Sequence, residues 1–421
     1  MSKWRVYTIG ELVKDKIIAP PMDGNHGDIH PKGNDFVFEG IPFIMASDIK
    51  DGVISFDECK FITKNQADGL RKGFAQEGDV LLTHKATIGR TAIVPKTKYP
   101  YLMLTPQVTY YRVIDTKLLE NRYLKYCFDN DTFQKSLGLW AGAGSTRAYL
   151  GILGQHNLAI KIPCVETQRK IADVLSVLDN KIACNNRINT ELEAMAKTLY
   201  DYWFVQFDFP DANGKPYKTS GGEMVYNAIL KREIPAGWTV NTLSQIANIT
   251  MGQSPAGESY NEDGIGTLFF QGSTDFGWLF PTPRQYTTSP ARMAKKGDIL
   301  LSVRAPVGDM NIANADCCIG RGLAALNSKS SSDGFLFYVM KYFKKVFNRR
   351  NAEGTTFGSM TKDDLHSLQV VCPEPGLLKR YDDVVSEYNK MIFTRSLENQ
   401  DLIKLRDWLL PLLMNGQITV K

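Results

Sequence analysis

Basic and amide side chains lie near glycines at several points of the sequence, in patterns that could contact a nucleic acid. Lys85 and Arg90 lie on either side of Gly89, and Arg304 lies in a closely similar segment farther along the chain. Lysine and arginine bind phosphate, and arginine can also donate two parallel hydrogen bonds to guanine, as glutamine can pair with adenine. The candidate DNA-contacting residues are Lys85, Arg90, Gln107, Arg147, Gln271, Ser273, Arg304, Arg321, Thr355 and Lys362.

Each of these residues could also be an ordinary solvated side chain. Motifs for catalysis or metal binding would indicate a different function. The sequence contains no GxxxxGK(S/T), HExxH or GxSxG motif, and no GxGxxG that follows a strand. Asp51 with the segment 58–60 resembles an acidic nuclease motif, but such a pattern arises easily by chance. His26 and His30 have the spacing of metal ligands on a helix, yet the glycine between them favours a loop. We therefore predict no catalytic residue, no metal site and no cofactor.

The candidate residues fall into two copies of an internal repeat, and a repeat must be found before elements are assigned. GDVLLTHKATIG, which begins at Gly78, aligns without gaps with GDILLSVRAPVG, which begins at Gly297. PFIMASD from Pro42 similarly resembles LFFQGST from Leu268. In both copies, short apolar runs broken by Gly, Pro and Asp predict a β-rich unit with few helices. We expect an α+β protein whose two globular units cover residues 1–163 and 236–373.

A long segment with helical periodicity follows each globular unit. Apolar residues recur there at alternating spacings of three and four, which is typical of a coiled-coil seam. The first seam contains Ile171, Leu175, Leu178, Ile182, Asn185, Asn189, Leu192, Met195, Leu199 and Tyr202. The second contains Tyr381, Val385, Tyr388, Ile392, Arg395, Asn399, Leu402, Leu405, Leu409 and Leu412.

The two seams match position by position, including their two polar positions, so we expect the helices to pack against each other. The chain order makes this pair antiparallel, with the globular units at the two ends of a rod. At about 1.5 Å per residue, the segment 166–203 would be roughly 57 Å long. The segment 206–235 is rich in Gly, Pro, Asp and Lys and predicts a surface linker.

Composition limits the remaining classes of protein. The chain has 421 residues, 43% of them hydrophobic, with 50 Lys and Arg against 45 Asp and Glu. This mild positive excess is compatible with a polyanionic partner. Seven dispersed cysteines without CxxC spacing suggest neither a disulfide framework nor a zinc knuckle. With no long apolar run and no secretory leader, we expect a cytoplasmic protein that does not enter a membrane.

Two aromatic or leucine-rich segments, LYDYWFVQF from Leu199 and DWLLPLLMNG from Asp407, carry more apolar residues than two-helix packing requires. An exposed apolar surface commonly marks a protein interface. The candidate partner-binding residues are Tyr202, Trp203, Phe204, Trp408, Leu409 and Leu412.

Taken together, the two units and their helices resemble the specificity subunit of Type I restriction-modification systems. The segments that carry the resemblance are ETQRKIADVLSVLDNKI (166–182), LYDYWFVQFDFPDANGKPYKTSGGEMVY (199–226), IPAGWTVNTLSQIA (234–247) and MGQSPAGESYN (251–261). The resemblance implies a first target recognition domain at 1–163, a spacer helix at 164–205, a linker at 206–235, a second recognition domain at 236–373, and a second spacer helix with the C-terminal tail at 374–421.

The resemblance also implies partners and a function. Each recognition domain would bind one half of a bipartite double-stranded DNA target, and the helices would set the gap between the halves. Two methyltransferase subunits that bind S-adenosylmethionine and modify adenine would dock on this chain, together with ATP-dependent restriction subunits. The chain itself would be non-catalytic.

Two other classes remain open from the residues alone. A nuclease or a stand-alone methyltransferase could carry a DNA-binding repeat, but the only Pro-Pro pair, Pro20-Pro21, lacks the surroundings of an adenine methyltransferase motif. A coiled-coil adaptor that never binds nucleic acid is the third class.

Overall fold

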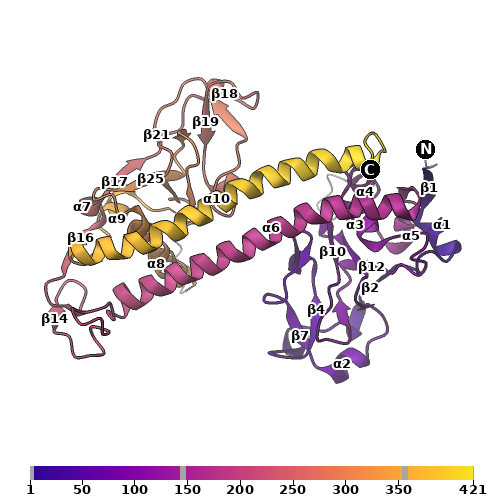
Figure 1. Cartoon of the computed structure of the whole chain (residues 1–421), viewed down its shortest axis with the longest axis horizontal. Coiled ribbons are helices and arrows are strands. Elements are labelled where there is room, and N and C mark those ends of the chain that lie inside the picture. Colours follow the sequence, from indigo (N-terminus) through magenta and orange to yellow (C-terminus); the bar gives the residue numbers. More distant parts are fainter. Residues whose placement is uncertain (1–3, 143–147, 353–358, 421) are drawn as a thin grey trace. The chain divides into compact units, whose positions relative to one another are not determined.

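The computed structural model describes residues 4–142, 148–352 and 359–420, which belong to two compact units. The first unit consists of residues 1–182 and 401–421, and the second of residues 183–400. Two long helices, α6 (Val165–Tyr200) and α10 (Pro375–Met414), pass from one unit into the other (Figure 1). Each unit therefore contains part of both helices, and the C-terminal end of the chain folds with the N-terminal domain.

Among its described residues, the first unit contains three sheets, a two-stranded ribbon and five short helices besides its parts of α6 and α10. Its strands are β1 (Arg5–Thr8), β2 (Met22–Asp23), β3 (Phe36–Val37), β4 (Ile41–Ile44), β5 (Ile49–Lys50), β6 (Val53–Ile54), β7 (Lys60–Ile62), β8 (Phe74–Ala75), β9 (Val80–Lys85), β10 (Thr87–Ile93), β11 (Leu102–Leu104), β12 (Val108–Tyr111) and β13 (Ala159–Ile162). Its helices are α1 (Ile9–Lys14), α2 (Lys64–Asp68), α3 (Asn121–Asp129), α4 (Asp131–Trp140) and α5 (Ile152–Gln155). A two-stranded ribbon of β5 and β6 lies beside these sheets.

The second unit has a related set of elements. Its strands are β14 (Met224–Asn227), β15 (Arg232–Pro235), β16 (Thr239–Thr242), β17 (Ala247–Met251), β18 (Tyr260–Asn261), β19 (Thr267–Phe270), β20 (Gln285–Thr287), β21 (Met293–Ala294), β22 (Ile299–Ser302), β23 (Met310–Ile312), β24 (Cys317–Ile319), β25 (Leu323–Ser328) and β26 (Gln369–Cys372). Its helices are α7 (Leu243–Ile246), α8 (Asp333–Ala352) and α9 (Lys362–His366).

The sheet topology confirms the internal repeat. The order β10-β9-β12-β2 in the first unit corresponds to β23-β22-β25-β17 in the second, and β3-β7-β4-β11-β8 corresponds to β18-β20-β19-β24-β21. The pair β1-β13 corresponds to β16-β26. Each five-stranded sheet contains one parallel pair, β4 with β11 and β19 with β24, among antiparallel neighbours. The predicted α+β class with two repeated globular units is confirmed.

The central strand of each four-stranded sheet shows why its sequence is a continuous apolar run. In β9, Val80 and Leu82 point into one hydrophobic core and Leu81 into another, because successive side chains of a strand point to opposite faces. In β22, Leu300 likewise enters a different core from the residues on either side of it. Both faces of these strands are covered, so neither strand shows a polar face.

The long helices pack antiparallel, as the matched seams predict. In the first unit, Ile171 and Leu175 of α6 share a core with Leu410 and Leu413 of α10. In the second unit, Tyr200 of α6 shares a core with the beginning of α10, around residues 381–385. No helix in the described part of the chain is both long enough and apolar enough to cross a membrane.

The predicted seam is wrong in the last third of α6. Up to Leu192 the buried positions follow it, but beyond that residue Ala196, Tyr200 and Trp203 are buried, whereas Met195 is exposed. The buried face has moved by one residue. An α-helix has 3.6 residues per turn and drifts away from a strict 3.5 repeat, and no supercoil is needed once the helix end is enclosed by a globular core.

The same shift occurs at the matching point of α10. Leu405, which matches Met195, is exposed, whereas Leu410 and Leu413, which match Tyr200 and Trp203, are buried. Before this point, Ser396 is buried next to the predicted seam position Arg395, and Asn399 is buried on the seam. The repeat therefore extends to the environment of the helix ends, which the heptad spacing alone did not predict.

A polar cluster lies between the helices in the second unit, near its boundary. The Nδ2 of Asn185 donates to Oδ1 of Asn399 at 2.9 Å, and Asn399 donates to Asn186 at 2.8 Å. Asn189 donates to the hydroxyl of Ser396 at 3.3 Å. Buried amides between helices favour the one register in which they find partners. Three of the four polar seam positions, Asn185, Asn189 and Asn399, therefore help to define the register of α6 against α10. The fourth, Arg395, does not, and its neighbour Ser396 takes part instead.

The segment predicted as a surface linker is folded. Phe207 and Phe209 are buried, and their rings lie 5.5 and 5.0 Å from the ring of Trp238. The strands β14 and β15 then form a hairpin. The two ends of the segment thus enter the second unit's core through Phe207, Phe209 and Ile234, whereas residues 211–233 remain at the surface.

Replacing Trp203 by Ala should destabilise the second unit by about 3–5 kcal/mol, because the change opens a cavity in a packed aromatic cluster. Trp408→Ala is the matched control, since that side chain is 62% exposed, and should change the stability by less than about 0.5 kcal/mol. Hydrogen exchange of the amides of β22 and β25 reports on the second unit alone. Equal effects of the two substitutions would contradict the burial described above.

Candidate nucleic-acid interface

In the first unit, three loops meet at one edge of the sheets. Because β4 and β11 are parallel, the loops that follow Ile44 and Leu104 leave from the same edge. The backbone N–H of His84, near the end of β9, donates to the carbonyl oxygen of Gln107 at 2.9 Å. The turn between β9 and β10 therefore lies beside the loop between β11 and β12. We call this the loop edge of the first unit.

Three predicted DNA-contacting residues, Lys85, Arg90 and Gln107, come together at this loop edge. The backbone N–H of Ala46 donates to Oε1 of Gln107 at 3.4 Å. The guanidinium of Arg90 donates to the carbonyl oxygens of Ala46 and Ile49, at 3.3 and 3.1 Å. Arg90 thus holds the loop that follows β4 in place, a positioning role that its sequence position did not indicate.

Gly89 allows the backbone conformation that precedes Arg90. It has φ of 90°, and a Cβ there would lie 2.1 Å from the side-chain oxygen of Gln134. The register of β10 against β9 shifts between Ile88 and Thr91, so a bulge contains the glycine.

Lys85 ends β9 and is exposed. Its Nζ lies 5.8 Å from the ring centre of Tyr149, which is 47% exposed. Tyr149 was not among the predicted contacts, although an exposed aromatic ring beside a lysine is a common feature of nucleic-acid surfaces. Arg147, which was predicted, lies outside the described residues.

The second unit has an equivalent loop edge, organised by the hydroxyl of Ser254. Nε2 of Gln271 donates to Oγ of Ser254 at 2.9 Å, and the backbone N–H of Arg321 donates to the same oxygen at 3.3 Å. A Cβ at Gly322 would lie 2.7 Å from the carbonyl oxygen of Gln271, so this glycine permits close packing of the two loops. Ser273 begins the turn that follows Gln271.

Arg304 and Lys362 lie at the same edge. The N–H of Val303 donates to the carbonyl oxygen of Gly322 at 2.9 Å, which places Arg304 beside Arg321. The N–H of Met360 donates to Val303 at 2.8 Å, so Lys362, the first residue of α9, follows closely. Thr355 lies outside the described residues.

The two loop edges share a backbone and differ in side chains. The bond from His84 to Gln107 corresponds to that from Val303 to Gly322, which makes Gln107 equivalent to a glycine. By the same alignment, Arg321 occupies the position of a proline in the first unit. A shared frame with different polar side chains can present different hydrogen-bonding patterns to bases.

The residues predicted to bind a partner divide into three groups by burial. Trp203 and Phe204 are buried in the second unit's core, so they are not available on the surface, and that prediction is wrong for both. Tyr202 and Trp408 are exposed. Leu409 and Leu412 are partly buried. Trp203 and Phe204 correspond to Leu413 and Met414 in the repeat, and those two are buried in the first unit's core.

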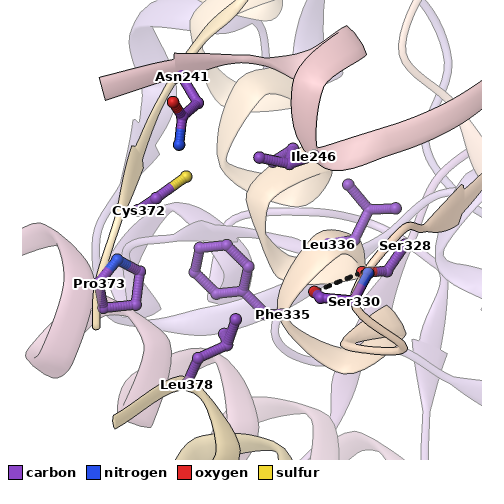
Figure 2. Close-up of a pocket in the computed structure, with 9 residues that line it drawn as sticks. All are labelled: Asn241, Ile246, Ser328, Ser330, Phe335, Leu336, Cys372, Pro373 and Leu378. Atoms are coloured by element: carbon purple, nitrogen blue, oxygen red, sulfur yellow. Dashed lines mark hydrogen bonds between the residues drawn. The ribbon is translucent and has the colours of Figure 1, made fainter. Parts of the chain in front are cut away.

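A small pocket of about 100 Å³ lies in the second unit, beside the start of α10 (Figure 2). Phe335 and Leu336 of α8 line it together with Ile246, Leu378 and Cys372. A typical small-molecule site measures about 300–1,000 Å³. The pocket contains none of the candidate DNA-contacting residues, so it adds nothing to the loop edge.

The histidine and acidic segments considered for metal binding have other contacts. His26 pairs with Asp23, and Glu58 pairs with Lys50. Within the residues that the structure describes, no three His, Cys, Asp or Glu side chains form a group suited to a metal ion. The seven cysteines are free thiols.

The similarity of this chain to known proteins shows its family. The family described as the Type I restriction modification DNA specificity domain matches residues 1–194 and 235–376. The chain belongs to the family of Type I restriction-modification specificity subunits. A specificity subunit is the non-catalytic part of a restriction enzyme complex. The two matched ranges correspond to the two repeats, and each includes a loop edge.

Relatives cover nearly the whole chain. The specificity subunit of the MjaX enzyme of Methanocaldococcus jannaschii is 30% identical over 389 residues, 91% of this chain and 88% of the relative. That of the HindI enzyme of Haemophilus influenzae is 22% identical over 481 residues, with 99% and 100% covered. The solved S subunit from M. genitalium has the same fold, with a TM-score of 0.56 and 15% identity over 98% of this chain and 96% of the other.

Arg321→Ala should lower the affinity for a specific duplex by about 1–3 kcal/mol and relax the base preference at one position, if its guanidinium contacts a base. Lys379→Ala removes the same charge from an exposed position of α10 and serves as the control. Binding titrations against duplexes with each base substituted in turn give both quantities. A uniform loss of affinity with a salt dependence lowered by about one unit would instead show a phosphate contact.

Proposed function

We propose that this specificity subunit recognises a bipartite double-stranded DNA target, with one half bound at the loop edge of each unit. The observation that carries the proposal is the repeated frame with different side chains. Lys85 and Gln107 at one edge correspond to Arg304 and Gly322 at the other, where Arg321 is added. Two different half-sequences are what two such edges would select.

We propose further that α6 and α10 act as the spacer between the half-sites. Each helix contains residues of both units, which is why we assign the spacing to this pair. Asp179 pairs with Arg406 in the first unit and Asn185 with Asn399 in the second, which is one antiparallel register throughout. We therefore assign recognition to the domains at 1–163 and 236–373. We assign the spacing of the half-sites to the helical segments at 164–205 and 374–421.

The partners proposed for this chain are two methyltransferase subunits, which bind S-adenosylmethionine, and ATP-dependent restriction subunits. Support comes from two apolar side chains left exposed one helical turn apart on α10 in the first unit, Leu405 and Trp408. An uncovered group of this kind is typical of a protein interface. Tyr202, exposed at the end of α6, is the candidate on the second unit.

Exchanging residues 1–163 for the corresponding domain of a relative should replace one half of the recognised sequence and preserve the other. Each domain has its own sheets and its own loop edge, so its selectivity should transfer with it. Methylation mapping in a host that carries the partner subunits shows the modified sequence. A change in both halves together would contradict independent recognition.

Removing residues 183–189 and 393–399 together should shorten the gap by about three base pairs. One heptad is about 10.5 Å of helix at about 1.5 Å per residue, and a base pair rises by about 3.4 Å. The loss also turns one unit by about 100° around the duplex, so binding could fail altogether.

Deleting the heptad from α6 alone is the control for this pair of deletions. It would shift α6 against α10 and leave Ser396 and Asn399 without their partners on α6, whereas the double deletion removes both sides of the polar cluster. The single deletion should therefore lose more stability than the double deletion. Methylation mapping of the double deletion measures the gap directly. An unchanged gap at normal efficiency would rule out the helices as the spacer.

A further inference from the structure

The segment that follows β2 belongs to the loop edge of the first unit. Its sequence suggested only a metal site. Asp23 at the end of β2 pairs with Thr109 near the start of β12, so the chain leaves β2 beside Gln107. The N–H of Gly24 donates to the carbonyl oxygen of Thr105 at 3.3 Å. A Cβ on Gly24 would lie 1.9 Å from the carbonyl oxygen of Leu104, the last residue of β11, so the segment packs directly against the start of the loop that follows β11.

His26 is presented from this segment by a buried carboxylate. Its side chain is 47% exposed, and its Nε2 lies 2.7 Å from Oδ2 of Asp23, which is only 4% exposed. Lys72 contacts the other oxygen of Asp23. Burial raises the pKa of Asp23, but hydrogen bonds from Lys72 and His26 lower it further, so the carboxyl is ionised. A carboxylate only accepts, so Nε2 carries the hydrogen and Nδ1 is left for another partner.

The second unit has a functional counterpart at this position. Gly252 follows β17 as Gly24 follows β2, and Ser254 comes two residues later, as His26 does. The hydroxyl of Ser254 binds Gln271 and the backbone of Arg321, two predicted contacts. The position is therefore part of the loop edge in the second unit, and the repeat places His26 at the loop edge of the first.

The charged and titratable groups around His26 are Asp23, Lys72, His30 and His84. Asp23 and Lys72 neutralise each other. Burial lowers the pKa of His30 and of His84 and so favours their neutral forms. A protonated His26 would add a positive charge to the loop edge that carries Lys85.

We propose that His26 contacts a DNA backbone phosphate through Nδ1 in its protonated form, and that Asp23 is the positioning residue that orients its ring. The proposal rests on the proposed DNA recognition by this unit. Binding of DNA then takes up a proton at the first loop edge, and the affinity falls as the pH rises. The second loop edge has a serine at the matching position and lacks this dependence.

The test uses the full-length chain purified with a Type I methyltransferase subunit. A preferred sequence is first selected from a library of random duplexes, and its affinity is measured at about pH 6 and about pH 8. The wild type should bind about tenfold more tightly at the lower pH. His26→Gln should lose this difference, keep the selected sequence, and show a salt dependence at the lower pH reduced by about one unit.

Two further variants separate contact from folding. Ser254→Ala, at the matching position, should lower the affinity equally at both pH values. Asp23→Asn removes the charge that orients His26 and should shift the pH profile. A pH dependence that His26→Gln leaves intact would overturn the proposal, as would a changed base preference in that variant. Failure to select any sequence would overturn the proposed recognition itself, and the inference with it.

Discussion

The candidate interface depends on one parallel pair of strands in each unit. Because β4 runs beside β11 and β19 beside β24, two loops must leave the same edge of each five-stranded sheet. In each unit, a backbone hydrogen bond then joins the end of β9 or β22, in the four-stranded sheet, to one of these two loops. The frame is made of backbone contacts, so the side chains on it can differ between the units without changing the fold. This is the property that a repeated recognition domain requires.

The long helices connect these frames through a second constraint, their antiparallel register. Apolar burial supplies most of the favourable free energy between them, but apolar contacts alone tolerate sliding. The hydrogen bonds that join Asn185 to Asn399 and Asn189 to Ser396 require one register and so oppose sliding. At the helix ends, apolar side chains are buried in a globular core and not only against the partner helix. Trp203 is an example in the second unit, and Leu413 in the first.

Much of the fold was predictable because the repeat is visible in the sequence. The gapless match of the β9 and β22 segments, and the matched phase of the helices, were enough to predict two α+β units and an antiparallel pair. The shift from Met195 to Ala196 was not predictable, because both the heptad and the true face contain apolar residues. The burial of Trp203 follows from that same ambiguity, since an aromatic residue suits a core as well as an interface.

The site was predictable only in part. Lys85, Gln107, Gln271, Arg304 and Arg321 lie at the loop edges, as residue type and position in the repeat indicated. Arg90 holds a loop through backbone carbonyls, and no sequence pattern reports such a bond. Tyr149 and His26 were missed as contacts because their neighbours at the edge are distant in sequence. Alignment of Gly24 with Gly252 was the one available signal.

Hydrogen exchange of the full-length chain, with and without its selected duplex, tests the central claim most directly. The account predicts that protection by DNA concentrates in the amides of residues 45–48, 86–89 and 105–107 in the first unit and of residues 271–275, 305–308 and 320–322 in the second. The exposed faces of α6 and α10 should change little. Protection confined to the helices, or to one unit alone, would contradict a target bound in two halves at two equivalent loop edges.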